Sequence, residues 1–134
     1  MEEIWAESEI TEIIIEPKES YLLVQSNGNK DFRFAKALWT EIAKTCKQRK
    51  CYNILGVAFT TSPPSANEAY QYGQLFKDLG IGETYRIAWV ELNPSTFKTS
   101  YFIETTLLNE GQNVRLFNNI PQAQKWLNKG GNLY

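Results

Sequence analysis

The chain has 134 residues, the size of one folded domain, and 43% of them are apolar, an ordinary share for a globular protein. Its 14 basic and 15 acidic side chains nearly cancel, which argues against a dedicated nucleic-acid binder. It contains no histidine, which excludes Ser-His-Asp and Cys-His catalysis and histidine metal sites. We therefore predict a single domain over residues 1–134, not an enzyme, with no metal and no cofactor.

The first half of the chain alternates apolar runs with turn residues. Two apolar runs joined by a short turn at residues 17–20 predict an antiparallel hairpin, and the polar residues 26–29 are expected to break the chain. Apolar steps of three and four then predict a helix, and a run that is apolar on both faces predicts a central parallel strand. The predicted elements are strand 11–16, strand 21–25, helix 34–48 and strand 54–59.

The second half begins with a helix start. Ser65 followed by Glu68 is typical of a capping box, and Gly80 is a suitable residue to end the helix that follows. Pro121 is well suited to the first turn of the last helix, which the glycines at 130–131 are expected to end. The predicted elements are helix 66–79, strand 85–92, helix 96–109, strand 114–117 and a last helix from Pro121.

This order of elements predicts an α/β fold, because strands that alternate with helices are joined by right-handed crossovers into a mostly parallel sheet. We expect a five-stranded sheet with an antiparallel N-terminal hairpin at its edge and four helices. Helices mainly on one side leave sheet surface to cover, and a homodimer is one way to cover it. Among the aromatic residues we expect core positions for Trp39, Phe59, Phe76, Trp89 and Trp126.

A candidate site follows the strand 54–59, because ligands of parallel sheets meet the carboxyl ends of the strands. Thr60, Thr61, Ser62 and Ser65 lie there, beside a predicted helix N-terminus that favours anions. Two interpretations stay open. Either Ser65 caps the helix and the others solvate a turn, or the segment is a phosphoacceptor or anion site.

Three further aromatic residues, Tyr70, Phe97 and Tyr101, are less well placed by helical period. They are either ordinary core and surface residues, the lining of a ligand pocket, or an exposed patch used for dimerisation. Cys46 and Cys51 fit neither a CxxC redox motif nor a zinc knuckle, so we expect two reduced thiols. The acidic start of the chain resembles no secretion signal, and no apolar run is long enough for a membrane span, so we expect a cytoplasmic protein.

The C-terminal half carries a pattern of short motifs. They are Arg86-Ile87-Ala88-Trp89-Val90, Phe102-x-Glu104, Asn109-Glu110-Gly111, Val114-Arg115-Leu116-Phe117, Ala123 and Trp126-Leu127. This pattern, over residues 50–128, resembles the SpoIIAA-like bacterial proteins, a branch of the STAS and SEC14-like superfamily. The resemblance implies a β-α superhelix with strands in sequential order, and a regulatory or ligand-binding role. Within the pattern, Glu104, Asn109 and Arg115 are expected to form a structural polar corner.

In anti-sigma-factor antagonists of this family, a partner kinase phosphorylates a serine in a motif like Asp-Ser-Ser-Gly. The matching segment here lacks the acid and the glycine, and Thr61 or Ser62 would be the nearest equivalents. The resemblance thus implies a non-enzymatic, cytosolic regulatory or protein-interaction module, with residues 60–66 responding to phosphate or another anion. Its partner would be an unidentified protein or a second copy. The alternative is a SEC14-like binder of a small apolar ligand or lipid at Tyr70, Phe97 and Tyr101.

Overall fold

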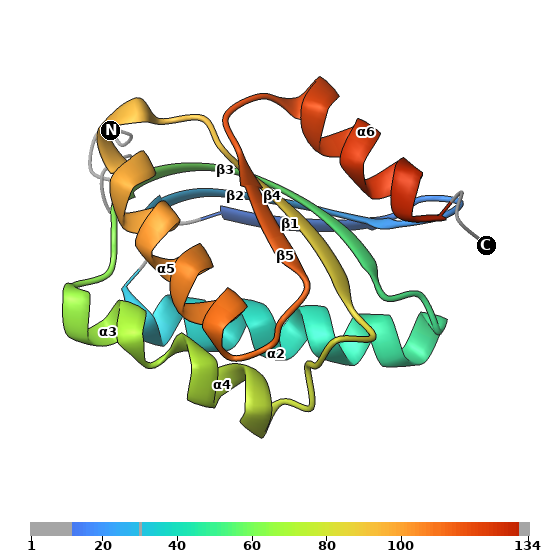
Figure 1. Ribbon diagram of the computed structural model, residues 1–134, viewed down its shortest axis with the longest axis horizontal. Coiled ribbons are helices and arrows are strands. Elements are labelled where there is room, and N and C mark those ends of the chain that lie inside the picture. The colour runs from blue at the N-terminus through green and yellow to red at the C-terminus, as the bar shows by residue number, and fades with distance from the viewer. Residues whose placement is uncertain (1–11, 30, 132–134) are drawn as a thin grey trace, which may run out of the picture.

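The computed structural model describes residues 12–29 and 31–131, which form one five-stranded sheet and the helices around it (Figure 1). Thr11, the first residue of the first predicted strand, lies outside the described residues. The strands are β1 (Glu12–Pro17), β2 (Leu22–Asn29), β3 (Asn53–Ser62), β4 (Arg86–Glu91) and β5 (Val114–Phe117). They lie in sequential order, β1 is antiparallel to β2, and the other neighbours are parallel. The predicted fold class is confirmed.

The helices are distributed unequally over the two faces of the sheet (Figure 1). The described helices are α2 (Phe32–Arg49), α3 (Ala66–Tyr70), α4 (Tyr72–Asp78), α5 (Phe97–Asn109), α6 (Ile120–Gly131) and the 3₁₀ helix η1 (Pro94–Thr96). One face, here called the helix face, packs Leu22, Ile54 and Ile87 against α2, α4 and α5. The other, the α6 face, packs Leu55 and Ala88 against α6.

Two strands are longer than the sequence predicts. Residues 26–29, expected to break the chain, extend β2, and residues 60–62, expected in a loop, extend β3. Both extensions continue the parallel pairing of β2 with β3, in which Gly28 pairs with Thr60 and, after a register shift, Asn29 with Ser62. Gly28 has a φ of 107°, a conformation that glycine adopts without steric cost. Pairing between strands far apart in the chain therefore overrides the local turn preference of these residues.

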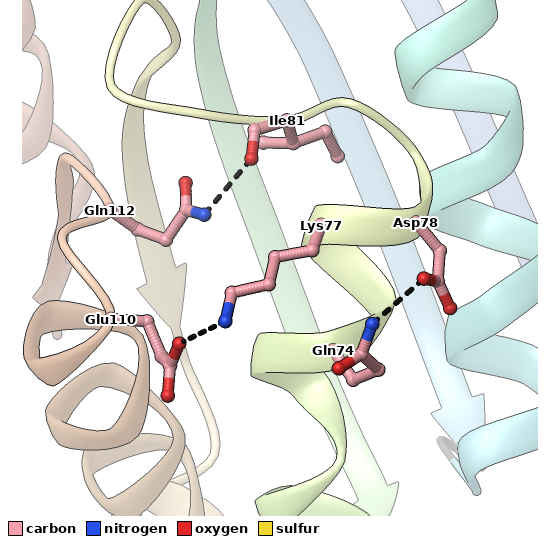
Figure 2. A network of polar contacts seen from close by, with 6 residues as sticks. All are labelled: Gln74, Lys77, Asp78, Ile81, Glu110 and Gln112. Carbon is pink, nitrogen blue, oxygen red and sulfur yellow. Dashed lines mark hydrogen bonds and ion pairs between the residues drawn. The ribbon is translucent and has the colours of Figure 1, made fainter.

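The predicted helix 66–79 is two helices in the structure, separated at Gln71. The Gln71 N–H donates to the carbonyl of Glu68 at 3.0 Å, a bond over three residues that tightens the last turn of α3. α4 is tied to the loop after α5 by an ion pair between Lys77 and Glu110 at 3.0 Å (Figure 2). Nearby, Gln112 Nε2 donates to the carbonyl of Ile81 at 2.9 Å (Figure 2). α6 begins at Ile120 and continues through the glycines that were expected to end it.

The core on the helix face is aromatic at its centre. The ring of Trp39 lies 4.8 Å from that of Phe76 and 5.4 Å from that of Trp89, centroid to centroid. Trp126 is half-buried on the α6 face beside Phe117. The prediction that Phe59 is buried is wrong, because Phe59 points to the α6 face beyond the residues that α6 covers and is 44% exposed.

Candidate functional site

The segment 60–65, which comprises the last three residues of β3 and the connection to α3, lies at the carboxyl end of the sheet. Its first residue is held by side chains from the end of β4 and the connection to α5. The Thr60 N–H donates to Oε2 of Glu91 at 2.9 Å. The Thr60 carbonyl accepts from Nδ2 of Asn93 at 2.7 Å and from Oγ1 of Thr96 at 3.1 Å. With Thr60 itself only 3% exposed, these contacts give the segment a fixed starting point.

Glu91 is the central residue of this arrangement. It is buried at the end of β4, and its Oε2 also accepts the N–H of Asn93 at 3.1 Å. It thus satisfies two backbone donors at the place where the ladder between β3 and β4 ends. No sequence pattern predicted Glu91, Asn93 or Thr96 as site residues. An acidic residue directly after the apolar run 87–90 was the signal that could have pointed to them.

The other candidate residues of the segment differ in their surroundings. Thr61 and Ser62 are exposed at the end of β3. Ser65 caps α3, and the predicted capping box is present, with the Glu68 N–H donating to Ser65 Oγ at 3.2 Å. Ser65 therefore has a structural role that a phosphate on its hydroxyl would disrupt.

The N-terminus of α3, where an anion was expected, already holds a carboxylate. Glu68 Oε1 accepts the Ser65 N–H at 2.9 Å, and Oε2 accepts the N–H of Phe32, the first residue of α2, at 3.3 Å. One glutamate thus occupies the N-termini of two helices, where negative charge is favourable. Because like charges repel, this end of α3 disfavours a further anion.

The three aromatic candidates do not line the cavity described below. Tyr70 and Tyr101 are exposed, and Phe97 is half-buried at the start of α5. The ring centroids of Tyr70 and Phe102 are 6.4 Å apart, and this aromatic pair joins α3 and α5 at the surface. Tyr70 and Tyr101 therefore belong to an exposed surface and not to an internal pocket.

A cavity of about 60 Å³ lies on the helix face, directly beneath the segment 60–65. Its walls come from β3, β4, β5, α2, α4 and α5, and they are mostly apolar. Its lining residues are Trp39, Thr60, Pro63, Pro64, Tyr72, Phe76, Ile87, Trp89, Ser100, Ile103, Glu104, Leu107, Val114 and Leu116.

The predicted polar corner of Glu104, Asn109 and Arg115 does not form among the described residues. Glu104 is buried and its Oε2 accepts the N–H of Leu116 at 2.7 Å, which joins α5 to β5. Arg115 is exposed, with its guanidinium 5.9 Å from the ring of Trp126 on the α6 face. Asn109 is exposed at the end of α5. Successive strand residues point to opposite faces, which separates Arg115 from Glu104.

A groove of about 380 Å³ lies on the α6 face at the same end of the sheet. Phe59 and Leu92, which line it, are 44% and 43% exposed and directly precede Thr60 and Asn93 in the chain. The groove is lined by Ile14, Gln25, Ser26, Asn27, Val57, Ala58, Phe59 and Leu92. An apolar surface and the exposed end of β3 therefore adjoin one another.

Both thiols are free in the structure. Cys46 is buried at the end of α2, and this burial, with a smaller contribution from Cys51, raises the pKa of its thiol to about 12. The thiol of Cys46 is therefore neutral and unreactive in the folded protein. Among the described residues, no helix is long and apolar enough to cross a membrane.

No protein-family model and no curated protein matches this sequence. The structure is similar to the crystal structure of an anti-sigma factor antagonist from Mycobacterium paratuberculosis, with a TM-score of 0.63 and 11% sequence identity. The match covers 89% of this chain and 95% of that chain. The fold is thus the STAS-like fold that the resemblance in the C-terminal half implies.

Proposed function

We propose that the protein is a non-enzymatic regulatory module of the cytosol that binds a partner protein at the carboxyl end of β3 and β4. The observation that carries this proposal is the pair of exposed apolar side chains, Phe59 and Leu92, beside the exposed residues Thr61 and Ser62. Protein interfaces commonly have apolar or aromatic side chains at their centre and polar residues around them. The structural similarity to an anti-sigma factor antagonist supports a regulatory role.

The backbone of this surface is ordered in advance. The backbone N–H of Thr60 is bonded to Glu91, and its carbonyl is bonded to Asn93 and Thr96. A partner would therefore meet a segment whose first residue is already fixed. Ordering a loop during association costs free energy, and a preformed surface avoids that cost. This arrangement favours a docking role for the segment.

Within the segment, Thr61 and Ser62 are the residues we propose as phosphoacceptors. Both are exposed, whereas Thr60 is buried and Ser65 caps α3. A phosphate there would add about one and a half to two negative charges beside the apolar surface, which would change partner binding. Mass spectrometry of the protein from its native host, on the peptide that contains residues 60–66, tests this point.

The interaction surface is tested with two matched variants. Phe59→Asp places a charge on the proposed surface, and Leu108→Asp places one on α5, where Leu108 is equally open at 47% exposure. Both proteins are expressed in the native host and cross-linked to their partners in the cell. We expect wild type and Leu108→Asp to retain the same cross-linked protein and Phe59→Asp to lose it. A cross-linked product unchanged by Phe59→Asp would refute the assignment of this surface.

A second copy of the chain is one partner that this experiment identifies. Sedimentation of wild type and Phe59→Asp separates the two cases. A wild-type dimer that Phe59→Asp converts to a monomer shows that two copies meet at this surface. A wild-type monomer directs the search to a different protein.

A second candidate function is the binding of a small molecule, and the cavity beneath the segment favours it. Its lining is mostly apolar and aromatic. It also includes the hydroxyl side chains of Thr60 and Ser100 and the carboxylate of Glu104. Binding sites for small molecules commonly combine apolar walls with a few polar groups. At about 60 Å³ the cavity has no room for a lipid tail, so this candidate is restricted to small ligands. Native mass spectrometry of the protein from its own host would detect such a ligand.

A further inference from the structure

The cavity beneath the segment 60–65 combines an aromatic wall with a buried carboxylate. Glu104 lines the cavity and is only 8% exposed. Its Oε2 accepts the Leu116 N–H at 2.7 Å, whereas no hydrogen bond or ion pair within the described residues involves its Oε1. The aromatic side chains of the lining are Trp39, Tyr72, Phe76 and Trp89.

The described part of the lining contains a carboxylate and no basic side chain. None of the described residues that line the cavity is a lysine or an arginine. A buried carboxylate is costly unless a cation or several hydrogen-bond donors compensate it. Aromatic rings present a negative face that attracts cations, most strongly when water is excluded. Both features of the lining therefore favour a positively charged group over a neutral or negative one.

We propose that this cavity binds an alkylammonium group, with the nitrogen at Oε1 of Glu104 and the alkyl chain against the aromatic wall. The proposal rests on the second candidate function given above, and it names the class of ligand. An ammonium group donates hydrogen bonds in three directions, so it can satisfy Oε1 and still contact Ser100 or Thr60.

The size of the cavity limits the length of the chain. A water molecule needs about 10–15 Å³ of such space, so about 60 Å³ accepts a chain of about four to six heavy atoms. The n-butylammonium ion, which is the side chain of lysine, falls within this range. A free amine and the lysine of a partner protein therefore supply the same chemistry.

The proposal is tested with a charged and a neutral probe of equal length. Purified protein is titrated with n-butylammonium chloride and, separately, with n-butanol, and the indole N–H signals of Trp39 and Trp89 are followed by NMR. We expect n-butylammonium to bind about ten-fold more tightly than n-butanol, because a charged hydrogen bond inside the protein is worth more than a neutral one.

Two glutamate variants identify the carboxylate. Glu104→Gln keeps an acceptor for the Leu116 N–H and removes the charge, so the two probes should bind with nearly equal affinity. Glu83→Gln removes the charge of an exposed glutamate outside the cavity and should leave the preference unchanged. A preference for n-butylammonium that survives Glu104→Gln would overturn the proposal.

The outcomes separate this proposal from the function on which it rests. Equal binding of both probes to wild type refutes the alkylammonium assignment and leaves a site for small neutral ligands. Binding of neither probe refutes both. A third variant, Ser100→Leu, places a larger side chain in the cavity at a half-buried position of its lining. It should abolish binding of both probes while the protein remains folded.

The source of the amine is decided by a third probe, lysine blocked at both its amino and carboxyl groups. If it binds as n-butylammonium does, the cavity accepts a lysine side chain from a partner protein. If it is excluded while n-butylammonium binds, the cavity accepts a free amine. Both results support the alkylammonium assignment.

Discussion

Gly56, in the middle of β3, lies directly against the indole of Trp89, and replacing it with alanine is the sharpest test of this packing. An ideal Cβ at Gly56 would lie 2.0 Å from Cε3 and 2.2 Å from Cζ3 of Trp89. Ordinary carbon contacts are about 3.5–4.0 Å, so the indole would have to move by more than 1 Å. The ring of Trp39 also packs against that of Trp89, with ring centroids 5.4 Å apart, and restricts that movement.

We expect Gly56→Ala to lower the free energy of unfolding by about 2–3 kcal/mol, which is the upper part of the range for overpacked cores. The cavity beside Trp89 admits part of the displaced ring, so the cost stays below that of a wholly rigid site. For a chain of this length, the loss corresponds to a fall in melting temperature of roughly 10 °C. Urea denaturation followed by circular dichroism measures it.

A double-mutant cycle isolates the contact. In the Trp89→Leu background the indole is absent, and Gly56→Ala should then be neutral or stabilising, since alanine costs less backbone entropy than glycine by about 0.5–1 kcal/mol. Gly82→Ala is the matched control, because no atom of the described residues, its chain neighbours apart, lies within 4 Å of its ideal Cβ. A cost of Gly56→Ala that is the same with and without Trp89 would refute the assignment of the strain to this contact.

Three further predictions concern helix ends, α6 and pH. Glu68→Gln should cost about 1 kcal/mol in urea denaturation, because the charge stabilises the N-termini of α2 and α3 together. Arg86→Lys should cost about 1 kcal/mol and speed hydrogen exchange in α6, because the guanidinium lies 3.7 Å from the Trp126 ring and donates to its carbonyl. Burial raises the pKa of both Cys46 and Tyr85 to about 12, so the stability they contribute should fall as pH rises from about 9 toward 12. If denaturation at pH 8 and pH 11 gave equal stability, their burial would be contradicted.

Elements with strong local signals were predicted well from the sequence. The strand 114–117 has the predicted bounds, because polar residues on both sides delimit a short segment in which Arg115 is the single polar residue. The capping box of Ser65 and Glu68 is a short-range motif, and it is present as expected. The hairpin of β1 and β2 also follows from a short turn between two apolar runs. In each case the sequence signal that predicts the element lies within a few neighbouring residues.

The errors arise where distant contacts decide the structure. The extensions of β2 and β3 consist of polar residues whose strand partners, in β3 and β2, lie about 30 residues away along the chain. Likewise, Thr60 was predicted as a candidate, but its partners Glu91 and Thr96 are 31 and 36 residues away along the chain. No periodicity of the sequence contains that information. The same reason explains why Glu104 and Arg115 were expected together although they lie on different faces of the sheet.

The exposure of Phe59 follows from the relative lengths of two elements. α6 has 12 residues and therefore spans about 18 Å, whereas β3 has 10 residues and spans about 33 Å. α6 reaches the first residue of β4, where Arg86 contacts Trp126, so the part of the sheet that it leaves open is the carboxyl end. On the helix face, that same end carries the held segment at Thr60 and the cavity beneath it. Because the α6 face has one short helix in the described part of the chain, its exposed apolar side chains lie at the same edge of the sheet as the hydrogen-bonded segment at Thr60. Both proposed functions therefore use this edge.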